Sequence, residues 1–538
     1  QKLSIIAAKI VHCAKIARCQ FLLFFIQIKE IIYMNKKNKF LLFFFTILLF
    51  FNILLFLTNI WIFDNFGNVK IQEILFTLLS PTSGTDSSVV YSYILRVLLI
   101  AVSFTVLSCF IVLYTRKKSK HFKYIKNISA IFVVVSLFLS CLYTNSRYDI
   151  YGYISQKSQT TSIYNKSKKT KEKVKKEEYQ GDSTIVYQNP KEINISGSDT
   201  NNLIYIYLES IENTFLDTAH GGVKAINCMP ELTELALNNT SFSNNELLGG
   251  AIPFTGTTWT IASMTSQFTG LPLKVEVAND MDQQNRFMPG AKTIGDILNE
   301  NGYIQELMIG SQKEFAGTDK LFLQHGFDKI SDINSLKEQY LIKNDDLNQW
   351  GLKDYKLFEL AKNELTELSQ KGKFNFTMAT IDCHMPKGFL CKYCPNTYEN
   401  RYENIYACQS KLINSFIDWC KSQSWYENTT IVLVGDHPTM AQQYVNDVPS
   451  DYQRTTYNCF INSKVTTDQI KNRQFTHMDM YPTTLAAMGF NIEGNKLALG
   501  TNLFSELPTI IEKYGQDYIN EEVQKSSEYL DKNIYQFN

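Results

Sequence analysis

The chain has 538 residues and nearly balanced charge, with 53 Lys and Arg against 52 Asp and Glu and a formal net charge of +1. This length exceeds that of one small domain, and the average composition conceals two unlike halves. The second half lacks a sustained basic stripe with interleaved aromatic residues, which argues against nucleic acid as a partner.

The first 33 residues precede a stretch typical of a bacterial start. The sequence "MNKKNKFLLFFF" begins at Met34 with a short basic region followed by an apolar run, so residues 1–33 are expected to be an upstream extension. If "FLLFFIQI" (21–28) belongs to the protein, it is too short to cross a bilayer and would lie at the interface.

Residues 34–143 are predicted to form an all-α membrane anchor. Three apolar runs are close to the roughly 20 residues that a spanning helix needs. Lys-rich "NKKNK" (35–39) precedes the first run, and "RKKSKHFK" (116–123) joins the second to the third, whereas the loop 64–90 is poor in Lys and Arg. The positive-inside rule then places everything after residue 143 outside the cytoplasm. We therefore predict a multi-pass protein of the bacterial inner (cytoplasmic) membrane, with its second half in the periplasm or outside the cell; the alternative for each run is a buried core helix. The runs are 40–63, 91–114 and 125–143.

Residues 144–200 are predicted to be a polar, Lys-rich stalk. Lys recurs here among Ser, Thr and Glu, with few apolar residues to bury. The alternative is a basic collar that rests on anionic lipid headgroups.

The region 201–538 reads as an α/β domain. Apolar runs at 203–210, 374–384 and 430–437 alternate with helical patterns at 355–372 and 403–422. Strands that are buried on both faces and separated by helices indicate a mainly parallel sheet sandwiched by helices.

Metal-ligating residue types follow these strands. Glu209, His384 and the pair Asp436 and His437 stand at or just past the carboxyl ends of three predicted strands, the edge where open α/β sheets bind ligands. Singly, Glu209 could cap a helix, Asp436 could accept loop amides, and His384 could be a hydrogen-bonded loop residue. Together, two carboxylates and an imidazole at one edge indicate a divalent metal site.

A candidate nucleophile lies in "GTTWTIASMTSQFTGLPL" (256–273). Residues 261–268 read as a helix stopped by Gly270, which puts Thr260 at a helix N-terminus, where free amides and the dipole favour a phosphate. The alternative is a plain Thr N-cap. A hydroxyl becomes a useful nucleophile when a divalent metal binds it directly.

Seven segments in this order resemble the alkaline phosphatase and sulfatase superfamily. Within it, they are similar to the membrane-anchored lipoteichoic acid synthase and phosphoglycerol transferase branch, above all to the enzymes that attach phosphoglycerol to osmoregulated periplasmic glucans. The likeness covers roughly residues 200–505, and it implies an alkaline-phosphatase-like fold for a sulfatase-like catalytic domain over 201–538. The segments are "YLESIENTF" (207–215), "GTTWTIASM" (256–264), "FAGTDKLFLQHGFD" (315–328), "WGLKD" (350–354), "DCHMPKGF" (382–389), "GDHP" (435–438) and "THMDMYPTTLAAMGF" (476–490).

The resemblance implies a role for each matching residue at the metal. Glu209, Asp436 and His437 would be protein ligands of one divalent cation, Mn or Mg in this branch and Zn in relatives. Thr260 would be both the nucleophile and the remaining ligand.

The substrate side follows from the same resemblance. His384 would contact the substrate phosphate or the leaving oxygen, and Trp350 with Lys353 would line the site. Thr318 departs from the pattern, because the similar glucan enzymes carry Lys after "FAG", which leaves recognition of the headgroup or acceptor open.

The implied reaction is a two-step exchange. Thr260 attacks the phosphorus of phosphatidylglycerol, diacylglycerol leaves into the bilayer, and a hydroxyl of a periplasmic glucan or another surface glycan then displaces phosphoglycerol from the threonine ester. The anchor keeps the domain at its lipid donor and so raises its effective concentration.

Three rival functions remain at this stage. A phosphoethanolamine transferase acting on a surface glycolipid or glycan would share Thr260 and the metal core. A sulfatase would need Cys or Ser in a C/S-x-P-x-R setting, whereas "IAS" follows Thr260. A catalytically dead, membrane-tethered binding protein would not need an intact ligand set.

Seven cysteines lie in the second half, and the predicted topology puts them in an oxidising compartment. The pair "CKYC" (391–394) could be half a zinc knuckle, but no second pair follows at suitable spacing, so disulfides are favoured. An odd count leaves at least one thiol free, and Cys383 is the expected one.

Overall fold

The computed structural model describes residues 36–67, 69–79, 87–118, 122–165, 185–275 and 286–537. These residues form two compact units, one made of the long N-terminal helices and one of residues 65–86 and 149–538. The predicted extension 1–33 lies outside the described residues.

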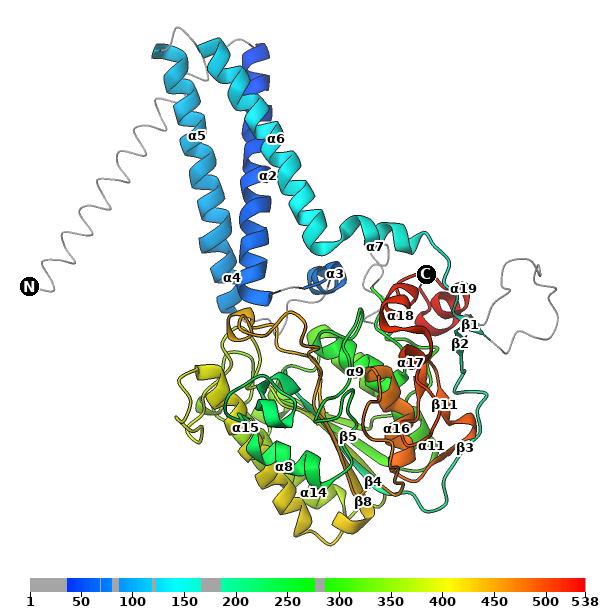
Figure 1. The fold of residues 1–538 in the computed structure, drawn as a ribbon. Coiled ribbons are helices and arrows are strands. Elements are labelled where there is room, and N and C mark those ends of the chain that lie inside the picture. The colour runs from blue at the N-terminus through cyan, green and yellow to red at the C-terminus, as the bar shows by residue number, and fades with distance from the viewer. Residues whose placement is uncertain are drawn as a thin grey trace, which may run out of the picture. The chain divides into compact units, whose positions relative to one another are not determined.

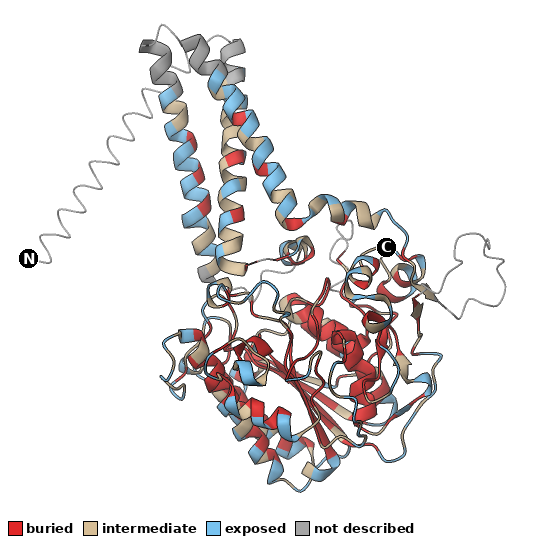
Figure 2. Ribbon diagram, viewed as in Figure 1, coloured by how far each residue is buried: buried red, intermediate tan, exposed pale blue. Residues whose placement is uncertain are grey.

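Among the described residues, the first unit contains three helices that are long and apolar enough to cross a membrane, as predicted. Large apolar residues are exposed along them, including Phe43, Phe104 and Phe132. Figure 2 shows the exposed residues of these helices as pale blue stretches of the ribbon. A surface of this kind suits lipid rather than water. The helices are α2 (Lys36–Phe66), α4 (Ser87–Tyr93), which continues through the π-helical turn η1 (Ile94–Leu98) into α5 (Leu99–Lys118), and α6 (Phe122–Tyr148).

A six-stranded sheet forms the centre of the second unit (Figure 1), and its order is β6-β5-β7-β4-β8-β9. The first five strands are parallel, and β9 pairs antiparallel with β8. The predicted mainly parallel sheet is therefore confirmed, with one antiparallel edge strand. The strands are β4 (Asn202–Leu208), β5 (Ile304–Ile309), β6 (Lys329–Ser331), β7 (Phe374–Ala379), β8 (Thr429–Gly435) and β9 (Asn458–Ile461).

Helices cover both faces of this sheet. Alternate residues of β4 point to opposite sides, so Tyr205 packs in one apolar cluster and Ile206 in the other. Both clusters are buried, which explains why these strands read as continuous apolar runs (Figure 2). One face carries α9 (Thr260–Thr269), α11 (Ile294–Glu300), α12 (Thr318–Leu323) and α16 (Met480–Ala487); the other carries α8 (Pro230–Asn238), α13 (Ile333–Glu338), α14 (Asp354–Leu368) and α15 (Arg401–Lys421).

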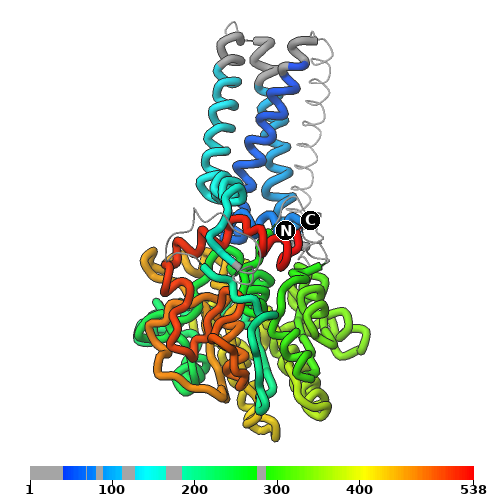
Figure 3. The backbone as a smooth tube through the Cα atoms, turned by 90° about the vertical axis from the view of Figure 1, so that its right-hand side faces the viewer, coloured from blue at the N-terminus to red at the C-terminus, as the bar shows by residue number. Residues whose placement is uncertain are grey.

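The connector expected over 144–200 is structured at both ends. Ile185 and Tyr187 are buried in the apolar core of the second unit, and Gln188 pairs with Ala498. Figure 3 shows this stretch running along the domain beside its C-terminal part. The stalk prediction is wrong there because these apolar residues pack; most of its lysines lie in 166–184, outside the described residues. The elements are α7 (Ile150–Lys157), β1 (Tyr164–Asn165), β2 (Val186–Tyr187) and β3 (Ile195–Ser196), which pairs with β10 (Asn491–Ile492).

Short elements complete the second unit. The segment α3 (Ile71–Leu79), which lies in sequence between two spanning helices, belongs to this unit, and its Phe76 joins the apolar core. The remaining elements are the hairpin β11 (Lys496–Leu497) and β12 (Gly500–Thr501) and the helices α17 (Ile510–Tyr514), α18 (Gln516–Glu522) and α19 (Glu528–Leu530).

Candidate metal and phosphate site

Two neighbouring strands deliver the acidic residues to one place. In the parallel pairing of β4 with β8, Leu208 is the partner of Gly435. The next residues along the two strands are Glu209 and Asp436, so both carboxylates leave the sheet side by side at its carboxyl edge. This is the edge at which open α/β sheets bind ligands.

Four side chains meet at this edge. His437 Nε2 lies 3.8 Å from Glu209 Oε1 and 3.5 Å from Asp436 Oδ2. Thr260 Oγ1 lies 3.3 Å from His437 Nε2 and 3.4 Å from Glu209 Oε2. Glu209, Asp436 and His437 are buried, whereas Thr260 is half-buried and so accessible to solvent. Residues more than two hundred positions apart thus enclose one small volume.

The donor atoms fit a divalent cation. His437 Nδ1 lies 3.0 Å from the Pro438 carbonyl, and donation to that carbonyl leaves the lone pair of Nε2 directed at the cluster. Asp436 Oδ2 is buried without a hydrogen-bond partner in the described structure, although a buried carboxylate oxygen normally has one. Two carboxylates, one imidazole and one hydroxyl form a mixed oxygen and nitrogen set that suits Mn, Mg or Zn.

The electrostatics favour a cation at the same point. Burial, together with repulsion from Glu209, raises the pKa of Asp436 to about 7. Burial alone would lower the pKa of His437, but the neighbouring Asp436 and Glu209 outweigh it and raise that pKa. The carboxylates are therefore costly to hold charged in this dry site, and a positive ion offsets that cost.

Backbone hydrogen bonds hold the loops that carry Glu209 and Asp436. Asp436 Oδ1 accepts hydrogen bonds from the N–H groups of Ser210 and His437, both at 2.7 Å. The Glu209 N–H donates to Thr380 Oγ1 at 2.9 Å, which links the loops after β4 and β7. These contacts hold the carboxylates in place before any ligand binds.

A buried ion pair ties the same loops together. Glu212 is fully buried and accepts two hydrogen bonds from Arg454, at 2.8 and 2.5 Å. It also accepts the Thr439 N–H at 3.0 Å, two residues beyond His437. The pair thus connects the loop after β4 with the loop after β8.

Thr260 is the first residue of α9, as the sequence predicts. Trp259, which has an extended backbone, occupies the N-cap position, so Thr260 does not cap the helix. The first amides of a helix lack intrahelical acceptors and attract anions. The plain N-cap alternative is therefore wrong, and the Thr260 hydroxyl is directed at Glu209 and His437.

His384, Trp350 and Lys353 form a second group. The His384 ring lies 4.1 Å from the Trp350 ring, centroid to centroid, and both side chains are half-buried. Lys353 Nζ donates to the Asp345 carbonyl and lies 5.1 Å from the centre of the Phe389 ring. The substrate roles of these three residues stay predictions.

A reciprocal carboxylate contact positions this second group. Asp354 accepts the N–H groups of Ile381 and Asp382, each at 2.8 Å, and Asp382 accepts the Asp354 N–H at 3.1 Å. Burial raises the pKa of Asp354 to about 7, and burial together with Asp354 raises that of Asp382. The segment with Trp350 is thereby joined to the segment with His384.

Glu73 of α3 lies near Thr260 in a position that the sequence does not predict. Glu73 is buried and accepts a hydrogen bond from Thr258 Oγ1 at 2.5 Å, two residues before Thr260. Phe76, on the same face of α3, packs against Trp259 with ring centroids 5.9 Å apart. Burial raises the pKa of Glu73 to about 7. The only signal in the sequence is one carboxylate within a short apolar stretch.

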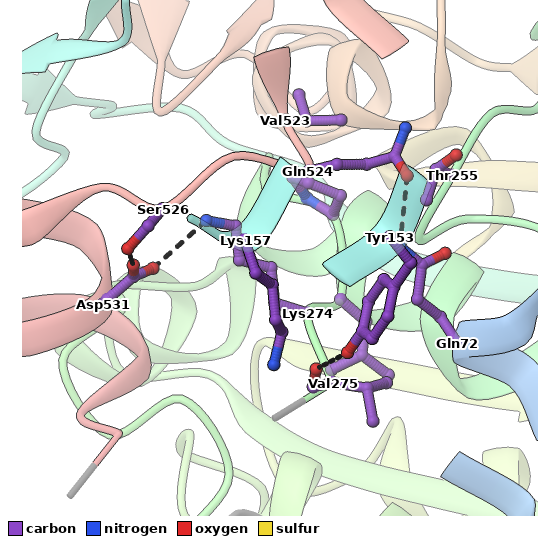
Figure 4. Close-up of a pocket in the computed structure, with 12 residues that line it drawn as sticks. Gln72, Tyr153, Lys157, Thr255, Lys274, Val275, Val523, Gln524, Ser526 and Asp531 are labelled. Atoms are coloured by element: carbon purple, nitrogen blue, oxygen red, sulfur yellow. Dashed lines mark hydrogen bonds and ion pairs between the residues drawn. The ribbon is translucent and has the colours of Figure 1, made fainter. Parts of the chain in front are cut away.

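A pocket of about 170 Å³ is lined by other parts of the same unit, including Gln72 of α3 and Thr255 (Figure 4). Within it, the Tyr153 hydroxyl donates to the Val275 carbonyl at 2.8 Å, and Lys274 pairs with Asp531 at 3.1 Å. The lining residues do not include any of the seven predicted site residues.

Known families and relatives match the part of the chain that contains this site. The family model described as "Sulfatase" matches residues 201–490, more than half of the chain. A relative called phosphoglycerol transferase I, from Xanthomonas campestris pv. campestris (strain B100), is 29% identical over 293 residues, which cover 53% of this chain and 40% of the relative. A protein of the same name from Citrobacter koseri is 32% identical over 256 residues, covering 46% and 32%. The chain therefore spans about two fifths of the length of the first of these relatives.

Solved structures give weaker likenesses. A protein of the alkaline phosphatase superfamily from Vibrio parahaemolyticus has a TM-score of 0.46 at 20% identity, covering 59% of this chain and 73% of its own. The integral membrane lipooligosaccharide phosphoethanolamine transferase A from Neisseria meningitidis has a TM-score of 0.47 at 12% identity, covering 86% of each chain.

Proposed function

Since the chain belongs to the sulfatase family, we propose that it is a phosphotransferase that moves phosphoglycerol from phosphatidylglycerol to a periplasmic glucan or another surface glycan, with Thr260 as nucleophile. The observation that carries the proposal is the approach of Thr260 Oγ1 to His437 Nε2 and Glu209 Oε2 at the N-terminus of α9. The relatives called phosphoglycerol transferase I support the choice of the transferred group.

The nucleophile argues against sulfate ester hydrolysis within this family. Sulfatases carry Cys or Ser in a C/S-x-P-x-R setting, whereas Thr260 is followed by Ile261, Ala262 and Ser263. A threonine hydroxyl beside a divalent-cation ligand set suits attack on phosphorus instead.

Glu209, Asp436, His437 and Thr260 would hold one divalent cation, Mn or Mg by resemblance and Zn as the alternative. When bound, such a cation lowers the pKa of a hydroxyl and offsets negative charge on a phosphoryl group.

The chain's own residues account for the two transfers. In the first, Thr260 Oγ forms a bond to phosphorus while the bond from phosphorus to the diacylglycerol oxygen breaks; the hydroxyl proton is lost and the departing oxygen gains one. In the second, an acceptor hydroxyl oxygen bonds to the same phosphorus, Thr260 Oγ leaves, and the threonine regains its proton. The amides at the N-terminus of α9 stabilise the phosphate throughout.

His384 is assigned to the phosphate or to the leaving oxygen. Its Nδ1 lies 2.9 Å from the Met385 carbonyl, and donation to that carbonyl leaves Nε2 to contact substrate. Trp350 packs against its ring and limits its rotation. Lys353, engaged with a carbonyl and an aromatic ring, is assigned to the wall of the same site.

The membrane helices support a lipid donor. Three of the described helices are long and apolar enough to span a bilayer, and the third ends at Tyr148, directly before residues of the unit that contains Thr260. We place the catalytic unit on the periplasmic or outer side of the cytoplasmic membrane, because the basic loops of the anchor belong in the cytoplasm.

Mass spectrometry of the purified full-length protein after incubation with phosphatidylglycerol tests the proposal. We expect a phosphoglycerol adduct on the peptide containing Thr260, and loss of both the adduct and diacylglycerol release in Thr260→Ala. The matched control is Thr265→Ala, which changes a buried threonine of the same helix whose hydroxyl bonds only the Ile261 carbonyl among the described contacts. An ethanolamine phosphate adduct from mixed lipids would identify a phosphoethanolamine transferase, and unchanged turnover in Thr260→Ala would refute the assignment of the nucleophile.

A further inference from the structure

A second cluster of metal-ligating side chains lies apart from Glu209, Asp436 and His437. Cys391 and Cys394 stand in the loop between β7 and α15, and Cys408 stands on α15 itself. Their sulfur atoms all lie within 4.8 Å of one another. The disulfides expected from the sequence are not present among the described cysteines, all of which are free, including Cys383.

The distances fit three corners of a tetrahedron. Cys391 Sγ lies 3.5 Å from Cys408 Sγ and 3.6 Å from Cys394 Sγ. A tetrahedral zinc site with Zn–S bonds of about 2.3 Å separates its sulfurs by about 3.8 Å, whereas a disulfide requires about 2.0 Å. The cluster is therefore much closer to a metal geometry than to a bond between any two sulfurs.

The loop backbone also points its amides at the sulfurs. The Tyr393 N–H donates to Cys391 Sγ at 3.3 Å, and the Cys391 N–H donates to Cys394 Sγ at 3.1 Å. Donors of this kind stabilise thiolate over thiol and orient metal ligands.

A cation explains how three cysteine sulfurs can lie this close together without a disulfide. Metal ligation requires deprotonated thiols, and a divalent cation offsets the repulsion between three neighbouring thiolates.

We propose that Cys391, Cys394 and Cys408 bind a thiophilic divalent cation of the zinc type, separate from the catalytic cation. Cys391 and Cys408 are buried and Cys394 is half-buried, so the fourth position opens on the side of Cys394 and takes water. The cation fastens the loop that contains His384 to α15, and its role is to hold that loop in place.

Cobalt substitution of the full-length protein in detergent tests this site apart from the catalytic one. Thiolate-bound Co²⁺ gives a strong near-ultraviolet charge-transfer absorption that oxygen- and imidazole-bound Co²⁺ does not give. We expect this band in the wild type and in Asp436→Asn, and one fewer equivalent of bound zinc and no band in Cys394→Ser. The matched control is Cys420→Ser, a buried cysteine of α15 outside the cluster, which should keep both.

Thiol mapping of the wild type makes the test independent of variant folding. With zinc bound, alkylation of Cys394 in the native protein should be slowed at least tenfold, and a chelator should restore it. A disulfide linking any two of the three cysteines, found in protein purified without reductant, would overturn the proposal. Reduced protein that shows no thiolate-to-cobalt band would overturn it equally.

Discussion

Replacement of Arg454 tests how far the stability of the loops at the carboxyl edge of the sheet depends on one buried ion pair. Glu212 has no exposed surface, and Arg454 supplies two of its hydrogen bonds, whereas Thr214 Oγ1 and the Thr439 N–H supply the others. In Arg454→Ala the carboxylate stays buried with those two neutral donors and without a countercharge. Attraction to Glu212 is also what raises the pKa of Arg454 against its own burial.

The expected loss is about 3 kcal/mol, the lower end of the roughly 3–5 kcal/mol that follows removal of one partner of a buried pair. The lower end applies because the Arg454 side chain is 27% exposed, so water can reach Glu212 in the variant. For a unit of about 400 residues, with an unfolding entropy of about 2.1 cal/mol/K per residue, the loss corresponds to a midpoint of thermal unfolding lower by roughly 3–4 °C. Activity should fall as well, because Glu212 links the loop after β4, which carries Glu209, to the loop after β8, which carries His437.

Thermal unfolding of the full-length protein in detergent, followed by tryptophan fluorescence, measures the effect. The double variant Glu212→Gln with Arg454→Met leaves no unpaired charge and should recover part of the loss. The matched control is Lys421→Ala, whose exposed pair with Asp418 contributes about 0–1 kcal/mol. The reasoning would be refuted if the unfolding midpoint of Arg454→Ala lay within about 1 °C of the wild type, well below the shift expected for a buried pair. It would also be refuted if the double variant were less stable than either single variant.

Three further outcomes are expected. Burial raises the pKa of Glu73 from 4.5 to about 7, so its protonation stabilises the fold fully below about pH 4.5 and ceases to do so as the pH rises through 7. Glu73→Gln should therefore be more stable than the wild type at pH 8, by up to about 3 kcal/mol, and not at pH 4; equal differences at both pH values in thermal unfolding would contradict this. In Gly435→Ala the added Cβ would lie 1.9 Å from the Ile211 carbonyl oxygen, so unfolding should be easier by about 1–3 kcal/mol or more, and a wild-type unfolding temperature would contradict the contact. Asp436→Asn retains an oxygen for the Ser210 N–H but loses a ligand charge, so Mn²⁺ affinity measured by calorimetry should fall more than about 100-fold; unchanged affinity would remove Asp436 from the ligand set.

The sequence predicts that Glu209 and Asp436 lie at one edge of the sheet because strand ends are local features. Continuous apolar runs mark β4, β7 and β8, and in a parallel sheet their carboxyl ends must share an edge, so Glu209 and Asp436 are expected near one another. The one-residue register that sets Leu208 opposite Gly435 depends on tertiary packing and is not visible in the pattern.

Long-range contacts explain what the sequence does not predict. Glu73 approaches Thr258 across 185 positions, and no periodicity in a nine-residue segment reports such a partner. The solvated-stalk prediction is wrong at its end for a similar reason. Residues 185–187 form an apolar run of only three residues, and Tyr187 is buried by contacts such as that with Tyr529 of the C-terminal part. The sequence indicates only part of the cysteine cluster. "CKYC" is a local motif, whereas Cys408 joins it only through the position of α15.

The presence of α3 in the catalytic unit bears on how this protein can be processed. Its residues 71–79 precede every bond at which a protease could shed residues 149–538 from the membrane helices. A fragment released by such a cut would leave behind Glu73 and Phe76, and with them the carboxylate beside Thr258 and the ring that covers Trp259. Shedding would thus remove the cover from the residues directly before Thr260, and a truncated preparation would lack contacts that the intact chain has.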